Sequence, residues 1–164
     1  MTRQEATEFY RMHSKAVYNT ALRILRDPSE AAEVMQDTLL RYLTAGLRSA
    51  NPAQAAAWLR TTCIRKAIDR LRLRRKDPVF VDVESLAEEE ETLAEERVER
   101  PSMEQIRRAM ETLPEPYALV LNLFLIERLS YAQIAEMTGQ KEVTLRSLCS
   151  RGKQKLIRIL KSHE

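Results

Sequence analysis

The first half of the chain contains stretches in which apolar residues recur at helical spacing. Over residues 5–25 the spacings are three, four and seven, which predicts an amphipathic helix with the apolar positions Phe9, Ala16, Val17, Ala21, Ile24 and Leu25. Asp27-Pro28-Ser29-Glu30 predicts the start of a second helix, because it offers an Asp N-cap, a Pro in the first turn and a Glu that can close a capping box. The apolar stripe of this second helix comprises Ala31, Val34, Met35, Thr38, Leu39, Tyr42 and Leu43.

The opposite side of the second helix is predicted to stay exposed. It combines acidic and polar groups with one apolar side chain, and its members are Glu33, Gln36, Asp37, Leu40 and Arg41. An exposed Leu beside two carboxylates suits a small docking patch for a basic partner helix. An ordinary solvated helix face is the alternative interpretation.

A third, long helix is predicted from Pro52 to about Lys76, after a loop at residues 46–50. Asn51-Pro52-Ala53-Gln54 repeats the cap, proline and Gln of a helix start. The apolar face of this helix comprises Ala55, Trp58, Leu59, Thr62, Ala67, Ile68 and Leu71. We interpret Trp58 as a core residue, with a platform for base stacking as the alternative.

The later turns of this third helix are strongly basic. Opposed by the single acid Asp69, the cations there are Arg65, Lys66, Arg70, Arg72, Arg74, Arg75 and Lys76. One or two cations are enough to complement a helix dipole, so this density predicts a path for nucleic-acid phosphates. A membrane surface is the rival partner, and it is disfavoured because the other face of the helix has the pattern of a core.

The last third of the chain predicts a helix-turn-helix. Ser102-Met103-Glu104-Gln105 is a capping box that opens a helix through Thr112, and Leu113-Pro114-Glu115-Pro116 separates it from an apolar helix over residues 117–126. Ser130 then caps a helix with Gln133 at its third position, Gly139 makes a turn, and another helix runs from about Lys141 into the tail. A helix, a tight Gly turn and a second helix form the pattern that places the second helix in the major groove of DNA.

The predicted recognition helix has an apolar and a basic side. Its apolar positions are Val143, Leu145, Leu148, Cys149, Leu156 and Ile157. The side expected to face DNA comprises Lys141, Thr144, Arg146, Ser147, Arg151 and Lys153. Cys149 lies on the apolar side, so we interpret it as a small core residue and not as a nucleophile.

Composition and charge agree with an all-α, two-domain organisation. The 164 residues are 44% hydrophobic and include only 3 glycines and 6 prolines, which is typical of helices joined by short turns. The net charge of +3 divides into +8 over residues 1–76, −8 over residues 77–100 and +3 over residues 101–164. We therefore predict domains at 1–76 and 102–164 joined by an acidic, mobile linker at 77–101. The linker is a spacer or, alternatively, a transient cover for the basic faces.

Several functional classes are disfavoured by what the chain does not contain. Cys63 and Cys149 form no CxxC pair, which argues against a disulfide scaffold or zinc site and favours a reducing compartment such as the cytoplasm. No apolar run approaches the length of a membrane span, so we expect no export and no membrane insertion. His13 and His163 are the only histidines and no Gly-rich phosphate loop is present, so we expect no enzyme, no cofactor and no small-molecule substrate.

Taken together, these segments resemble an extracytoplasmic-function (group 4) sigma factor over nearly the whole chain. Residues 27–41 are similar to the family's DxEDxxQExFLR helix, and residues 58–72 to its WLxxIARNxAIDxLRR segment. Leu113-Pro114, residues 129–135 and Thr144-Leu145-Arg146-Ser147 are similar to the LPxxxRxVxxLxxxxGLSYxEIA…GTVKSR domain.

The resemblance implies partners and roles. Residues 27–41 would dock on the clamp coiled coil of core RNA polymerase, with contacts from the exposed set Glu33, Gln36, Asp37, Leu40 and Arg41. The loop at 46–51 would hold a flipped base of the melted −10 element, and the basic helix would follow the upstream duplex. The C-terminal domain would read the −35 element and meet the polymerase flap, and an anti-sigma factor would cover both DNA-binding faces. Polymerase would supply the catalysis.

The chain departs from the family pattern at positions that read DNA. The Asn of the ARN triplet falls on Arg65, the Ser cap of the recognition helix on Lys141, its Gly on Val143 and a common Arg on Leu148. The −10 and −35 preferences of relatives therefore cannot be copied to this chain. A stand-alone helix-turn-helix regulator that binds its operator without polymerase is the main alternative function. A helical adaptor without a DNA role is disfavoured by the two basic faces.

Overall fold

The computed structural model describes residues 2–45, 51–75 and 100–162, and their regular structure is entirely helical. The chain divides into two compact units, Met1–Asp77 and Pro78–Glu164. The all-α prediction is confirmed. The loop at 46–50 and the acidic segment at 76–99 lie outside the described residues, so the sequence-based interpretations of these segments stay predictions.

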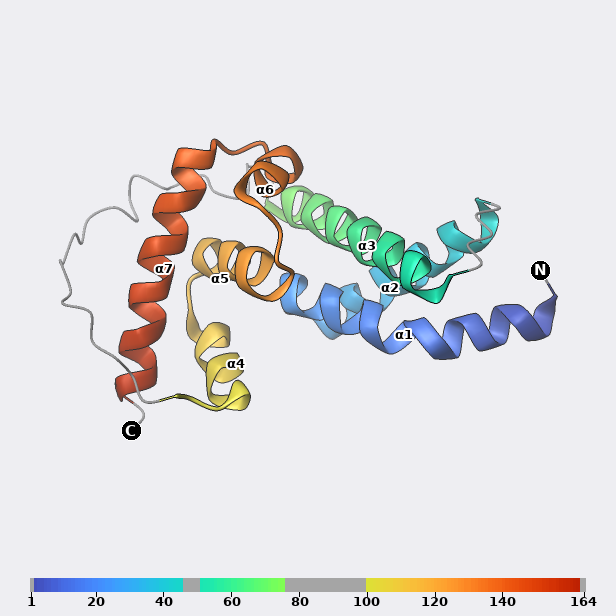
Figure 1. The fold of residues 1–164 in the computed structure, drawn as a ribbon, viewed down its shortest axis with the longest axis horizontal. Coiled ribbons are helices and arrows are strands. Elements are labelled where there is room, and N and C mark those ends of the chain that lie inside the picture. The colour runs from blue at the N-terminus through green and yellow to red at the C-terminus, as the bar shows by residue number, and fades with distance from the viewer. Residues whose placement is uncertain (1, 46–50, 76–99, 163–164) are drawn as a thin grey trace. The chain divides into compact units, whose positions relative to one another are not determined.

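The first unit is a bundle of α1 (Arg3–Leu25), α2 (Pro28–Thr44) and α3 (Pro52–Arg75). Each of these helices packs against the other two (Figure 1). The predicted stripe of α2 is buried except for Leu43, which is half-buried. Fully buried aliphatic side chains from all three helices form the core, among them Leu25, Val34, Leu59, Ile64, Ile68 and Leu71. Burial of these apolar side chains is the main stabilising contribution to the folding of such a small domain.

The cap of α2 follows the local sequence signal, except that one predicted hydrogen bond is not formed. Asp27 caps α2 as predicted, since its Oδ1 accepts hydrogen bonds from the backbone N–H groups of Ser29 and Glu30 at 2.8 and 3.2 Å. The predicted return bond of the capping box is not formed. The carboxylate of Glu30 pairs instead with Arg74 of α3, because a full positive charge is a stronger partner than a backbone N–H.

The second unit contains α4 (Met103–Thr112), α5 (Glu115–Leu121), the π-helical turn η2 (Asn122–Ile126), α6 (Tyr131–Thr138) and α7 (Glu142–Ser162). α7 packs against α4, α5 and α6 (Figure 1). The helix predicted at 117–126 begins two residues earlier, because Pro116 is tolerated within a first turn. It widens at Asn122, whose carbonyl accepts a hydrogen bond from the N–H of Glu127 five residues later.

Gly152 lets α7 approach α5 closely. A Cβ at this position would lie 3.2 Å from Cδ1 of Leu121 and 3.3 Å from Cβ of Tyr117. We expect Gly152→Val to lower the free energy of unfolding of the second unit by about 2 kcal/mol, because overpacking forces these neighbours apart. Urea denaturation of the variant measures this change. Ser150→Val is the matched control, since Ser150 is exposed on the same helix, and an equal loss in both variants would contradict the packing argument.

Candidate docking face and nucleic-acid interface

The outward face of α2 has the composition that the sequence predicts. Its five predicted members, Glu33, Gln36, Asp37, Leu40 and Arg41, are all exposed. Leu40 leaves 60% of its surface in solvent, whereas Leu39 beside it is buried. An apolar side chain among carboxylates is therefore available to a partner on this face.

Arg70, which was predicted to bind DNA, lies against the acidic groups of this α2 face. Its Nη1 lies 2.5 Å from Oε2 of Glu33, and its Nη2 lies 3.9 Å from Oδ2 of Asp37. All three side chains remain partly exposed. Two of the predicted docking residues, Glu33 and Asp37, and the predicted DNA-binding residue Arg70 thus form one charge cluster between α2 and α3.

Arg74 ties the end of α3 to the junction of α1 and α2. Its guanidinium pairs with the carboxylate of Glu30, and both of its terminal nitrogens donate hydrogen bonds to the carbonyl of Leu25 at 3.3 Å. This carbonyl belongs to the last turn of α1, where carbonyls have no partner within the helix. The geometry gives Arg74 a structural role in the unit.

Of the other predicted cations of α3, the structure describes the side chains of Arg65, Lys66 and Arg72. Arg65 is exposed, and Lys66 and Arg72 are half-buried. The side chain of Arg75 and the whole of Lys76 fall outside the described part of the chain. Because Arg65 and Arg72 lie seven residues apart, they share one side of α3.

Trp58 belongs to a row of aromatic rings inside the first unit. It meets Tyr42 edge-on with ring centroids 5.4 Å apart, and Tyr42 stacks on Phe9 at 4.6 Å. Phe9 in turn contacts His13, whose ring centroid is also 4.6 Å away. These contacts support the interpretation of Trp58 as a packing residue, although it remains half-buried at the edge of the core.

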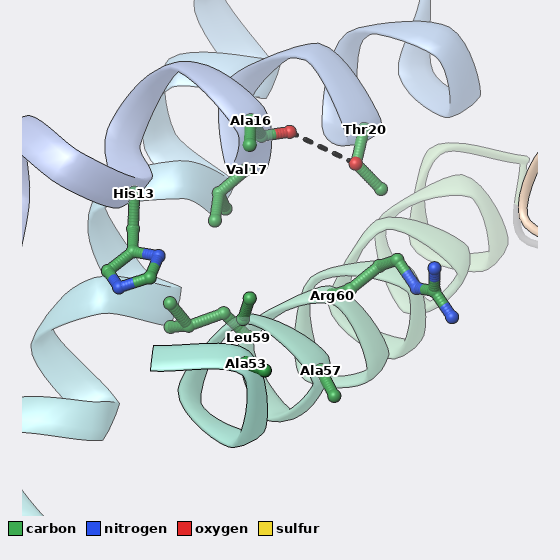
Figure 2. Close-up of a pocket in the computed structure, with 9 residues that line it drawn as sticks. His13, Ala16, Val17, Thr20, Ala53, Ala57, Leu59 and Arg60 are labelled. Carbon is green, nitrogen blue, oxygen red and sulfur yellow. Dashed lines mark hydrogen bonds between the residues drawn. The ribbon is translucent and has the colours of Figure 1, made fainter. Parts of the chain in front are cut away.

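An apolar hollow of about 380 Å³ lies between α1 and the first turns of α3 (Figure 2). His13 and Arg60 are the ionisable groups in its lining, and Figure 2 shows the guanidinium of Arg60 directed away from His13. Burial lowers the pKa of His13, which keeps its imidazole neutral at physiological pH. Thr20 lines the hollow but donates its hydroxyl proton to the carbonyl of Ala16 at 3.0 Å. The lining holds no paired nucleophile and base.

The helix-turn-helix has the predicted caps and turn. The hydroxyl of Ser130 accepts a hydrogen bond from the N–H of Gln133, and the Gln133 side chain accepts one from the N–H of Ser130, which completes a capping box for α6. Gly139 ends α6 with a φ of 76°, a left-handed conformation that glycine adopts without steric cost. α7 begins three residues later at Glu142, so the turn has the short length of the DNA-binding motif.

Three of the six residues predicted to face DNA from the C-terminal helix are exposed, and three are half-buried. Lys141, just before the helix, is exposed, as are Arg146 and Lys153 within it. The remaining predicted DNA-facing residues, Thr144, Ser147 and Arg151, are half-buried. Leu148 and Cys149 are buried, as predicted. The prediction that Val143 is buried is wrong.

Val143 is 76% exposed because it lies on the side of α7 that also carries the exposed residues Arg146 and Lys153. Leu145, two residues later, is the first fully buried position of α7. Two residues correspond to about 200° around a helix, so Val143 and Leu145 lie on opposite sides of α7, and the apolar character of Val143 was a misleading guide to its face.

Two cations of α7 lie over a pair of stacked rings from other helices. Tyr131 of α6 and Phe124 of η2 stack with centroids 4.4 Å apart and a 9° angle between their planes. The Arg146 guanidinium carbon and Lys153 Nζ each lie 5.6 Å from a ring centre, Arg146 over Tyr131 and Lys153 over Phe124. Burial and a hydrogen bond with Cys149 raise the pKa of Tyr131 to about 12, so its hydroxyl stays neutral. The ring pair restricts where both cations can lie.

Sequence reasoning missed the residues that act through distant contacts. Glu30 was expected to serve only its own helix, and Tyr131 and Phe124 were not singled out. The alternation of apolar residues cannot reveal pairs such as Glu30 with Arg74, which are 44 positions apart. Within the described ranges, no group of His, Cys, Asp or Glu side chains could hold a metal ion. None of the helices that the structure describes is long and apolar enough to cross a membrane.

Comparison with known families assigns both units. Residues 9–77 match the family Sigma-70 region 2, and residues 103–156 match Sigma-70, region 4. Each unit of this chain is thus similar to one conserved region of the sigma-70 family. The region 2 domain contains the α2 face and the basic α3, and the region 4 domain contains the helix-turn-helix. The occurrence of both regions in one chain supports a sigma factor over a stand-alone regulator.

Relatives and a solved structure extend over both sigma-70 domains. The ECF RNA polymerase sigma factor SigE of Mycolicibacterium smegmatis is 28% identical and matches 95% of this chain, which spans only 62% of that protein. The RNA polymerase sigma factor SigV of Bacillus subtilis is 26% identical over 90% of this chain and 85% of its own length. The fold is shared with the sigma factor RpoE of Bartonella quintana, crystallised with the anti-sigma factor NepR, at a TM-score of 0.55 and 20% identity over 96% of this chain and 98% of that one.

Proposed function

We propose that this protein is a sigma factor of the extracytoplasmic-function, group 4, branch that binds core RNA polymerase and directs promoter recognition, melting and transcription initiation. The observation that carries the proposal is the pairing of a region 2 and a region 4 domain in one chain. Each domain exposes the side chains that its role requires, an acidic and apolar face on α2 and a basic face on α7. Polymerase supplies the catalysis, and the chain contributes binding and base capture.

The region 2 domain, residues 1–76, docks on the clamp coiled coil through the exposed face of α2. Glu33 and Asp37 supply negative charge for a basic partner, and Leu40 supplies an apolar anchor. The loop at 46–51 captures a flipped base of the −10 element, and the exposed side of α3 carries the upstream duplex. The region 4 domain, residues 102–164, reads the −35 element with α7 and meets the polymerase flap.

The acidic segment at 77–101 connects the two domains, and an anti-sigma factor is a further proposed partner. The RpoE structure that shares this fold is a complex with such a factor. A helical anti-sigma factor that covers both basic faces would block promoter binding. Equal promoter melting by the free protein and by the complex would contradict this. Because polymerase and chromosome are cytoplasmic, we place the action of the protein there.

The salt dependence of promoter binding separates phosphate contacts from structural arginines on α3. We expect Arg65→Ala to reduce the slope of log affinity against log salt by about one, because one phosphate contact is lost. Arg74→Ala is expected to leave the slope unchanged and to lower the free energy of unfolding, because Arg74 is held by Glu30 and Leu25. Binding titrations of polymerase holoenzyme at several salt concentrations measure both slopes, and equal slopes for the two variants would contradict this division.

A selection from random DNA tests the proposed function. Purified protein alone and protein combined with bacterial core polymerase are each used to select duplexes. A sigma factor gives enrichment of a −10 and −35 pair only with polymerase, because the free chain binds DNA weakly. Enrichment of a two-fold symmetric site by the protein alone would overturn the proposal in favour of a stand-alone regulator.

A further inference from the structure

Val143 is an apolar side chain in a position where the region 4 domain meets its ligand. It is 76% exposed in the first turn of α7, whereas Leu145, Leu148 and Leu156 of the same helix are buried. A single exposed aliphatic residue is ordinary on a protein surface. Val143 differs because the exposed cation Arg146 follows it by three residues on the same side of the helix, with the exposed acid Glu142 directly before it.

Four of the exposed residues of α7 form one continuous stripe. Val143, Arg146, Ser150 and Lys153 follow one another at spacings of three and four and are all exposed. The buried residues Leu145, Leu148, Cys149, Gly152 and Leu156 occupy the other side. Val143 and Arg146 are therefore neighbours on one face, and the side chain of Val143 meets whatever Arg146 meets.

We infer that Val143 contacts the C5-methyl group of a thymine in the −35 element, an inference that rests on the proposed function. The methyl group is the only apolar feature that a base pair presents in the major groove, and a Val side chain can neither donate nor accept a hydrogen bond. The contact favours thymine over cytosine, which presents an amino group and no methyl. The sigma-70 resemblance places a Gly here, which has no side chain to make such a contact, so this preference is a property of this chain.

The helix geometry limits where the thymine lies. Arg146, the neighbouring member of the stripe, is suited to a bidentate contact with a guanine. Val143 and Arg146 are separated by about one helical turn, roughly 5.4 Å, whereas successive base pairs are about 3.4 Å apart. The thymine therefore lies within about two base pairs of the guanine that Arg146 reads.

Replacing thymine by deoxyuridine removes only the methyl group and tests the contact directly. Promoter DNA selected with the holoenzyme is synthesised with each −35 thymine in turn changed to deoxyuridine, and holoenzyme affinity is measured. For the wild type we expect a loss of about fourfold at one position, the effect of one buried methyl group. For Val143→Ala we expect weaker binding of the thymine duplex and no further loss with deoxyuridine. Val143→Ala should fold, because the site is exposed and Ala is the better helix former.

Met103→Ala is the matched control, since Met103 of α4 is also 76% exposed but lies outside α7. It should reproduce the wild-type response to deoxyuridine. Identical deoxyuridine responses in the wild type and Val143→Ala would overturn the contact while leaving the sigma function intact, because the same holoenzyme still selects and transcribes its promoter. Failure to select any promoter with polymerase would overturn the proposed function and, with it, this inference.

Discussion

We expect the protein to lose its binding to core RNA polymerase when Asp37 is changed to Arg and Leu40 to Ala. The first change places a positive charge where a basic partner helix is expected, and the second removes the apolar side chain that is 60% exposed beside it. Removing a charge partner and an anchor from the centre of an interface weakens binding by about 100-fold or more. Retention of purified protein on immobilised core polymerase at low salt measures this loss.

The double variant needs two controls, because Asp37 also lies 3.9 Å from Arg70. Thermal unfolding by circular dichroism shows whether the variant is folded. Glu8→Arg with Met12→Ala makes the same kind of change on α1, where both residues are exposed, and should leave retention unchanged. Equal retention of the wild type and the folded Asp37→Arg, Leu40→Ala variant would show that this face of α2 does not bind polymerase.

Arg146→Ala is expected to weaken specific promoter binding by about 10- to 100-fold and to relax the preference for one G·C pair. A bidentate contact between Arg and guanine contributes about 1–3 kcal/mol of discrimination. Tyr131 holds the guanidinium at 5.6 Å from its ring centre, so the arginine is partly ordered before DNA arrives. Binding of the variant holoenzyme to all single-base changes of the −35 element measures both effects.

The controls for Arg146 separate charge from base reading. Arg146→Lys keeps the charge but cannot make the bidentate contact, so it should lose base preference as well. Arg107→Ala removes an exposed cation of α4 that pairs with Glu104 and should leave the base preference unchanged. If Arg146→Ala retains the wild-type preference at every position, Arg146 does not read a base.

Most helices and helix starts could be predicted, because they depend on neighbouring residues. The side chains of Asp27, Ser102 and Ser130 cap helices at the predicted positions, since the hydrogen bonds involved span two or three residues. The exposed face of α2 could be predicted equally well, because an apolar stripe at helical spacing determines which side of a helix remains in solvent.

The tertiary contacts that distinguish structural arginines from the other basic residues of α3 could not be predicted from the sequence. Arg70 and Arg74 belong to the same basic run as Arg65, and only the packing of α2 on α3 shows that carboxylates already hold these two. Local sequence also does not show that Tyr131 and Phe124 lie under the cations of α7. These are tertiary contacts between segments, and the order of residues along one helix carries no signal for them.

Transcription from a selected promoter shows whether this protein acts as a sigma factor. Purified core polymerase, this protein and a linear template with the selected −10 and −35 pair are combined, and the RNA products are measured. We expect a discrete run-off RNA only when core polymerase and the protein are both present, and we expect this RNA to be lost with the Asp37→Arg, Leu40→Ala variant. Tight binding of the template by the protein alone, with no RNA when core polymerase is added, would exclude a sigma factor and favour a stand-alone regulator.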